Sequence, residues 1–182
     1  LYIVGTPIGN LNDISSRTLN ILKNVSLIAC EDTRQTRKIM SKYAFTNNLI
    51  SFHGHNALNK TQKIIRDLEE GKSIALVSDA GMPSICDPGE ELVKIARNKG
   101  INVICIPGPC AAITALVSSG LPSSKFTFEG FLPKKKSERQ EILFEISKSK
   151  KTIILFESPH RFKKLLAAVS YTHLTLPTSV PV

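Results

Sequence analysis

The sequence lacks the common nucleotide-binding motifs, a zinc-type cysteine pattern and any apolar run of membrane-spanning length. Its first predicted strand is followed by Gly5-x-x-x-Gly9 instead of G-x-G-x-x-G, and G-x-x-x-x-G-K-S/T does not occur. These absences argue against an ordinary dinucleotide dehydrogenase and against a P-loop NTPase. No two of the four cysteines form a C-x-x-C pair, so a structural zinc site is not expected. Every apolar run is far shorter than the roughly 20 residues of a spanning helix.

The four cysteines also indicate the cellular compartment in which the protein is expected to work. Cys30 and Cys105 lie inside apolar runs, so both are predicted to be small core residues. Unpaired thiols of this kind favour a reduced, cytoplasmic protein. No signal-peptide pattern is visible, and the sequence opens at Leu1 within a strand-like run.

Positive charge is in clear excess. Lysine and arginine number 24 against 15 aspartates and glutamates, which gives a formal net charge of +9 and a pI of about 9.5. A surplus of this size favours a polyanionic partner, with nucleic acid first and an anionic membrane second. The alternative is a solvated basic surface without a specific partner.

Short apolar runs alternate with segments of helical period through the first two thirds of the chain. We predict strands at residues 1–4, 27–30, 49–52, 74–77 and 103–106, and helices at residues 14–23, 33–43, 61–70, 90–99 and 111–119. Gly71 and Gly100 occupy the positions of carboxyl-terminal helix caps, each before the next strand. This alternation predicts an α/β fold with a doubly wound, mostly parallel sheet in an N-terminal domain at residues 1–119.

A second α/β domain is predicted to begin in the polar, proline-bearing stretch at residues 120–125. It comprises a strand at residues 126–131, a helix opening with the capping box Ser137-x-x-Gln140, a strand at residues 152–156, and a helix from Pro159 to about Val169. Residues 120–170 hold too few strands to close a core, so this domain is expected to be incomplete. Residues 171–182 contain no charged side chain and are expected to be a non-native or disordered tail, with a frayed terminus as the alternative.

Three loops rich in glycine and proline follow predicted strands at their carboxyl ends. They read GTPIGNLND at residues 5–13, SDAGMPSICDPG at residues 78–89 and PGPC at residues 107–110. In a doubly wound sheet such loops meet at one edge, where helix amino termini offer free backbone N–H groups. Each loop alone could be an ordinary turn, but their matching placement predicts a small-molecule site.

Six segments in register resemble the ribosomal RNA small subunit methyltransferase I group of the tetrapyrrole methylase superfamily. They are TPIGNL at residues 6–11, EDTR at 31–34, VSDAGMPSICDPG at 77–89, PGPCAAITAL at 107–116, EGFLP at 129–133 and ESPHR at 157–161. The resemblance covers residues 1 to about 169. It implies two α/β domains that bind S-adenosylmethionine in the cleft between them, and transfer of its methyl group to the ribose 2′-oxygen of a cytidine in small-subunit (16S) rRNA.

The resemblance also assigns the cofactor contacts, position by position. The expected cofactor-binding residues are Pro7, Gly9, Asn10, Asp79, Ala80, Gly81, Pro83, Pro107, Gly108, Ala111 and Ala112. Those at positions 79–83 would hold the methionine part, and the adenosine would contact the second domain. The later strands of the family have no counterpart here, so this truncated chain is expected to be inactive by itself. A homodimer is expected at full length.

The group that accepts the proton of the ribose hydroxyl is not assigned by the resemblance. A general base should help, because a hydroxyl is a poor nucleophile. The first candidates are Glu31, Asp32 and His53, in a wider set that adds Asp13, His55, Asp79 and Asp87. Asp32 has an alternative role as the cap of the helix predicted to begin at Thr33. A metal held by His53 and His55 would need a third ligand, so no metal is expected and an RNA-contacting loop is favoured.

Basic side chains are the candidates for RNA contacts. Arg34, Arg37 and Lys38 lie on the helix predicted beside the site, and Lys134, Lys135 and Lys136 form a run before the second domain's first helix. Phosphate contacts of this kind position an RNA without reading its sequence, whether the substrate is naked rRNA or a 30S particle. For the lysine run the alternative is a solvated loop. Two other functions stay open: methylation of a corrin precursor or a diphthine intermediate, and a non-catalytic RNA-binding fragment.

Overall fold

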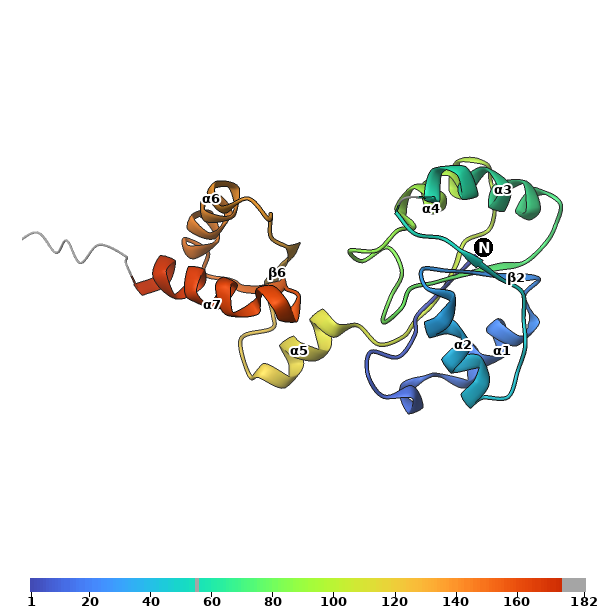
Figure 1. Cartoon of the computed structure of the whole chain (residues 1–182), viewed down its shortest axis with the longest axis horizontal. Coiled ribbons are helices and arrows are strands. Elements are labelled where there is room, and N and C mark those ends of the chain that lie inside the picture. Colours follow the sequence, from blue (N-terminus) through green and yellow to red (C-terminus); the bar gives the residue numbers. More distant parts are fainter. Residues whose placement is uncertain (55, 175–182) are drawn as a thin grey trace, which may run out of the picture. The chain divides into compact units, whose positions relative to one another are not determined.

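The computed structural model describes residues 1–54 and 56–174, and its contacts divide the chain into two compact units (Figure 1). Unit 1 is Leu1–Ala111 and unit 2 is Ala112–Val182. The sequence placed the domain boundary after residue 119, so the helix predicted at residues 111–119 falls almost wholly into unit 2 in this division. No helix in the described parts of the chain is both long and apolar enough to cross a membrane.

Unit 1 is built on a five-stranded sheet whose paired strands are all parallel. Its strands are β1 (Tyr2–Val4), β2 (Leu27–Cys30), β3 (Leu49–Ser51), β4 (Ile74–Val77) and β5 (Ile104–Ile106), in the order β3-β2-β4-β1-β5. The helices are α1 (Ser16–Asn24), α2 (Thr33–Lys42), α3 (Ala57–Glu69) and α4 (Glu90–Asn98), with a short 3-10 helix η1 (Leu11–Asp13). The predicted α/β fold with a parallel sheet is confirmed.

Helices cover both faces of this sheet, with α1 and α2 on one side and α3 and α4 on the other (Figure 1). The central strand β4 is buried at all four positions, as expected for a parallel strand covered on both faces. Ile74 and Leu76 pack in the cluster with α3 and α4, whereas Ala75 and Val77 pack in the cluster with α1. The alternation along β4 therefore joins two cores into one unit.

Element ends mostly follow local signals. The Ser15 hydroxyl accepts a hydrogen bond from the backbone N–H of Thr18 and caps α1, which begins two residues later than predicted. Gly71 and Gly100 have φ values of 86° and 72° and follow the last turns of α3 and α4, which confirms them as helix-ending residues. Helix α3 begins four residues earlier than predicted, without a side-chain cap to mark its start.

Unit 2 contains α5 (Ala111–Ser119) apart from its first residue, β6 (Phe126–Phe131), α6 (Lys136–Ser147), β7 (Thr152–Phe156) and α7 (Pro159–Leu174). Strands β6 and β7 pair in parallel, with an irregularity between Phe128 and Gly130. Leu132, Leu143 and Leu165 form the buried cluster of this unit.

Three expectations for this region and for the cysteines need correction. The capping box was wrong: α6 has Lys135 at its cap position with no side-chain bond, so Ser137 already lies inside the helix. Helix α7 continues past Val169 to Leu174, so the predicted tail begins within it, and residues 175–182 lie outside the described residues. Cys30 is buried as predicted, but Cys105, in the edge strand β5, is exposed.

Candidate functional site

The loops after β1 and β4 are joined at the carboxyl edge of the sheet. We call them the β1 loop (residues 5–10) and the β4 loop (residues 78–89). The backbone N–H of Thr6 donates to the carbonyl of Gly81 at 2.9 Å, and the N–H of Gly81 donates to the carbonyl of Thr6 at 3.0 Å. The Thr6 hydroxyl, which is buried, also donates to the carbonyl of Ser78 at 3.2 Å. Two of the three predicted loops are thus held together by reciprocal bonds.

The third loop, the β5 loop (residues 107–110), packs against the β1 loop through two glycines. A Cβ atom on Gly5 would lie 2.7 Å from the Cα atom of Gly108 and 2.7 Å from the sulfur of Met82. A Cβ atom on Gly108 would lie 2.8 Å from the Cα atom of Gly5. No side chain fits at either position, so the two backbones touch because both residues are glycine.

The β4 loop contains strained backbone and an unsatisfied buried group. Ser84 and Cys86 have φ values of 70° and 62°, a conformation that costs energy in residues other than glycine. The buried hydroxyl of Ser84 has no hydrogen-bond partner within the described residues. Strain and unpaired polar atoms of this kind concentrate at functional sites.

The carboxyl end of β2 joins the same edge through Asp79. The backbone N–H of Asp32 donates to the Asp79 carboxylate (Oδ1) at 2.9 Å. Four loops therefore meet at one edge: those after β1, β2, β4 and β5. Three of the four were predicted to converge there, and the fourth carries two of the candidate bases.

Comparison with known proteins agrees with this geometry. Residues 1–178 match the family described as Tetrapyrrole (Corrin/Porphyrin) Methylases. The chain belongs to the tetrapyrrole methylase family. Within that family it is similar to two proteins named Ribosomal RNA small subunit methyltransferase I, from Halalkalibacterium halodurans (52% identity, 91% of this chain) and Vibrio cholerae (52% identity, 88% of this chain). The resemblance found in the sequence motifs is confirmed.

The shared length is partial. The chain spans 57% and 56% of those two relatives. Among solved structures of tetrapyrrole methylase fold, a cobalt precorrin-4 methyltransferase of cobalamin biosynthesis aligns with a TM-score of 0.69 at 19% identity, over 94% of this chain and 74% of that one. Identity that low bears on the fold alone, and it confirms the α/β architecture.

The cofactor-binding residues expected for a tetrapyrrole methylase divide into buried and exposed sets. Pro7, Gly81 and Pro83 are buried and shape the loops from inside. The exposed members in unit 1 are Gly9, Asn10, Asp79, Ala80, Pro107, Gly108 and Ala111. Ala112, in the first turn of α5, is buried. Asp79 is exposed and is the one charged side chain among the residues predicted to bind the cofactor.

Among the candidate bases of this tetrapyrrole methylase, Asp32 caps the amino terminus of α2. Its carboxylate accepts from the backbone N–H of Arg34 at 2.8 Å and pairs with the Arg34 guanidinium at 2.6 Å. These hydrogen bonds from Arg34 lower the pKa of Asp32 to about 2. The predicted capping role is confirmed, and a carboxylate of such low pKa is a weak proton acceptor.

Glu31 has the opposite environment. Burial raises its pKa above the usual value, and the charges of Asp87 and Asp79 raise it further. The pKa of Asp87 is also raised, first by burial and then by Asp79. Glu31 is therefore the more basic of the two carboxylates, because burial first and then the neighbouring carboxylates disfavour its charged form.

His53 lies beyond β3, next to a structural asparagine. Its backbone N–H donates to the Asn56 side chain at 2.9 Å, and the Asn56 amide nitrogen lies 3.1 Å from its Nε2 atom. Its predicted companion, His55, lies outside the described residues. Among the residues that the structure places, no three His, Cys, Asp or Glu side chains gather as a metal site would require.

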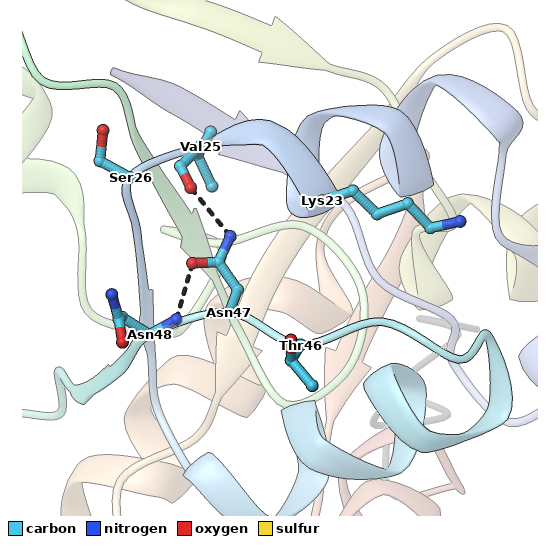
Figure 2. A pocket seen from close by; sticks show the side chains of 6 residues that line it. All are labelled: Lys23, Val25, Ser26, Thr46, Asn47 and Asn48. Carbon is cyan, nitrogen blue, oxygen red and sulfur yellow. Dashed lines mark hydrogen bonds between the residues drawn. The ribbon is translucent and has the colours of Figure 1, made fainter.

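A pocket at the opposite end of the strands is structural. It has a volume of about 440 Å³ and lies at the amino ends of β2 and β3 (Figure 2). The Asn47 amide donates to the carbonyls of Leu22 and Val25, and its oxygen accepts from the backbone N–H of Asn48. The Asn47 side chain thus joins chain segments, and the pocket lies at the end of the strands opposite to the converging loops, so this pocket is not the candidate site.

Sequence reasoning missed the residues that hold the loops together. Gly5, Thr6 and Ser84 were not among the predicted site residues. Gly5 and Thr6 come directly after β1, and that position was the available signal. Ser84 gave none, because its backbone conformation depends on the folded loop.

Proposed function

We propose that the protein, at the length of its relatives, is an S-adenosylmethionine-dependent methyltransferase for the ribose 2′-oxygen of a cytidine in small-subunit rRNA. The observation that carries this proposal is the convergence of the loops after β1, β4 and β5 through Gly5, Gly108 and the Thr6–Gly81 bridge. The names of the two relatives from H. halodurans and V. cholerae support the rRNA substrate. The cytoplasmic location and the homodimer stay predictions.

The residues at this edge fit the cofactor. S-adenosylmethionine carries a positive sulfonium, which supplies an electrophilic methyl group, and a positive amino group. Glu31, Asp79 and Asp87 place negative charge there, in a chain whose net charge is +9. The Oδ1 atom of Asp79 accepts the hydrogen bond from the backbone N–H of Asp32. Because the Asp79 side chain is exposed, its other oxygen can accept a hydrogen bond from an amino group of the cofactor. The unpaired Ser84 hydroxyl is a second polar group that a ligand could satisfy.

Glu31 is our candidate for the residue that accepts the ribose proton. Asp32 holds the start of α2 and the Arg34 side chain, and His53 is held by Asn56. Methyl transfer needs alignment above all, with a proton acceptor assisting the hydroxyl. Arg34, Arg37 and Lys38 on α2, together with Lys134, Lys135 and Lys136 in unit 2, would neutralise RNA phosphates.

Titration with S-adenosylhomocysteine tests the cofactor part of the proposal. We would compare the 182-residue chain with a chimera. In the chimera, this chain is joined to the part of the H. halodurans protein that it does not cover, so that the whole has the length of that relative. Binding by the chimera is expected. Absence of binding in both proteins would contradict the methyltransferase proposal and favour a non-catalytic RNA-binding protein.

The chimera then tests the reaction. Transfer of a labelled methyl group to small-subunit rRNA should leave one internucleotide bond resistant to alkali, because a methylated 2′-oxygen cannot attack the adjacent phosphate. The assay is run on naked rRNA and on 30S particles. Label that enters without an alkali-resistant bond would contradict the ribose assignment.

Replacing Asp79 with alanine should weaken S-adenosylhomocysteine binding about tenfold or more, as expected for a hydrogen bond to a charged group. The matched variant Asp79→Asn keeps an acceptor for the Asp32 backbone and removes the charge. Intermediate loss in Asp79→Asn would assign part of the effect to charge. Wild-type affinity in a folded Asp79→Ala chimera would exclude Asp79 from the site.

A further inference from the structure

Unit 2 contains a basic pocket of about 300 Å³ that the cofactor site does not include. It is lined by Lys134, Arg139, Glu157, Arg161, Lys164 and Leu165. Lys134 follows β6, and Glu157 is the residue directly after β7. Because β6 and β7 are parallel, both residues lie at the carboxyl edge of that pair, where ligands bind in α/β sheets.

One of the two guanidinium groups is fixed by a buried carboxylate. The Glu157 side chain is only 4% exposed and pairs with Arg161 at 3.0 Å. The other Glu157 oxygen accepts from the backbone N–H of Ser158 at 2.8 Å, and Arg161 also donates to the carbonyl of Leu132 at 3.0 Å. The pair positions Arg161 at the pocket wall and uses up the pocket's single negative charge.

Positive charge remains after that pair is made. Within the described residues, Lys134, Arg139 and Lys164 have no carboxylate partner. Arg139 is held in place by donating Nη1 to the carbonyls of Pro133 and Lys134, at 3.3 and 3.1 Å. Its buried Nε atom has no acceptor among the described residues. A buried donor without a partner is costly, and an anionic oxygen would satisfy it.

We propose that this pocket binds a phosphate group of the RNA strand on which the protein acts, an inference that rests on the proposed function. Arginine matches phosphate with several donors in a fixed plane, and lysine adds a point charge. The two arginines here are already positioned by the loop carbonyls and by Glu157. Binding therefore needs little further ordering of either side chain. Of the predicted RNA contacts, Lys134 alone lines this pocket.

The test compares two neighbouring lysines on α7. Both are exposed, but only Lys164 lines the pocket, so Lys163→Gln is a matched control for Lys164→Gln. Binding of a fluorescent single-stranded RNA to the 182-residue chain is measured across salt concentrations. Loss of one phosphate contact should reduce the slope of log K against log salt by about 0.7 in Lys164→Gln. The control should keep the wild-type slope.

Two further measurements distinguish a failure of the phosphate site from a failure of the proposed function. Inorganic phosphate should compete with RNA in the wild type and less in Lys164→Gln. Equal slopes in the two variants would overturn the proposal, as would phosphate competition that is the same in both. Titration of the chimera with S-adenosylhomocysteine is independent of these results. If it shows no cofactor binding while Lys164→Gln still flattens the slope, the proposed function fails and the phosphate site stands.

Discussion

Replacing Glu31 with glutamine is expected to lower kcat for rRNA methylation by about 10²- to 10⁴-fold, the usual contribution of a general base. Glutamine has nearly the same shape as glutamate, so S-adenosylhomocysteine binding should be retained. The rate should be measured in single turnovers of the chimera across pH. In the wild type it should rise with pH through the raised pKa of Glu31, because only the ionised carboxylate accepts a proton. This acid limb should be absent from Glu31→Gln.

Asp32→Asn is the control for this experiment. It removes the neighbouring carboxylate, which holds α2 and Arg34, and whose pKa of about 2 lies far below the pH range of the assay. The acid limb should therefore survive in Asp32→Asn even if the variant is less stable. An acid limb that persists in Glu31→Gln and disappears in Asp32→Asn would exchange the roles of the two residues.

Replacing Gly5 with alanine is expected to lower the free energy of unfolding by about 1–3 kcal/mol, the usual cost of overpacking. The new Cβ would lie 2.7 Å from the Cα atom of Gly108, and backbone cannot move aside as a flexible side chain can. Since relief requires the β1 and β5 loops to separate, S-adenosylhomocysteine binding should be lost as well. Urea denaturation of the 182-residue chain measures the first effect, and titration of the chimera measures the second.

Gly108→Ala should behave in the same way. The loss of unfolding free energy in the double variant should be smaller than the sum of the two single losses, because both substitutions disrupt the same contact between the loops. Gly54→Ala is the matched control, since a Cβ atom at Gly54 would have nothing within 4 Å. Unchanged stability and binding in Gly5→Ala would mean that the loops separate without consequence.

The strands were the most predictable part of the fold. Strands β2 and β4 begin and end where the apolar runs do, because buried parallel strands need apolar residues on both faces. Strands β6 and β7 also have the predicted bounds. Helix starts were less predictable. Ser137 has the right spacing to Gln140 for a capping box, but the chain enters α6 at Lys135. Arg139 and Arg161 hold the carbonyls just before that point, and no local pattern reveals such contacts.

The site was predictable as a set of loops and not as a set of contacts. Glycine and proline after predicted strands indicate which loops meet at the carboxyl edge. The pairing of Thr6 with Gly81 joins positions 75 residues apart, and the bond from Asp32 to Asp79 spans 47. The basicity of Glu31 depends on Asp87 in another loop. Interactions between distant residues have no signature in a single sequence.

The order of strands in unit 1 also determines when its sheet can form during synthesis. Strand β1 lies between β4 and β5, and its register pairs Tyr2 with Ala75 and with Ile104. Translation adds about 5–20 residues per second, so β1 waits on the order of several seconds for either neighbour. The Gly5–Gly108 contact closes later still. Until β4 is made, β1 lacks both of the strands with which it pairs in the folded sheet.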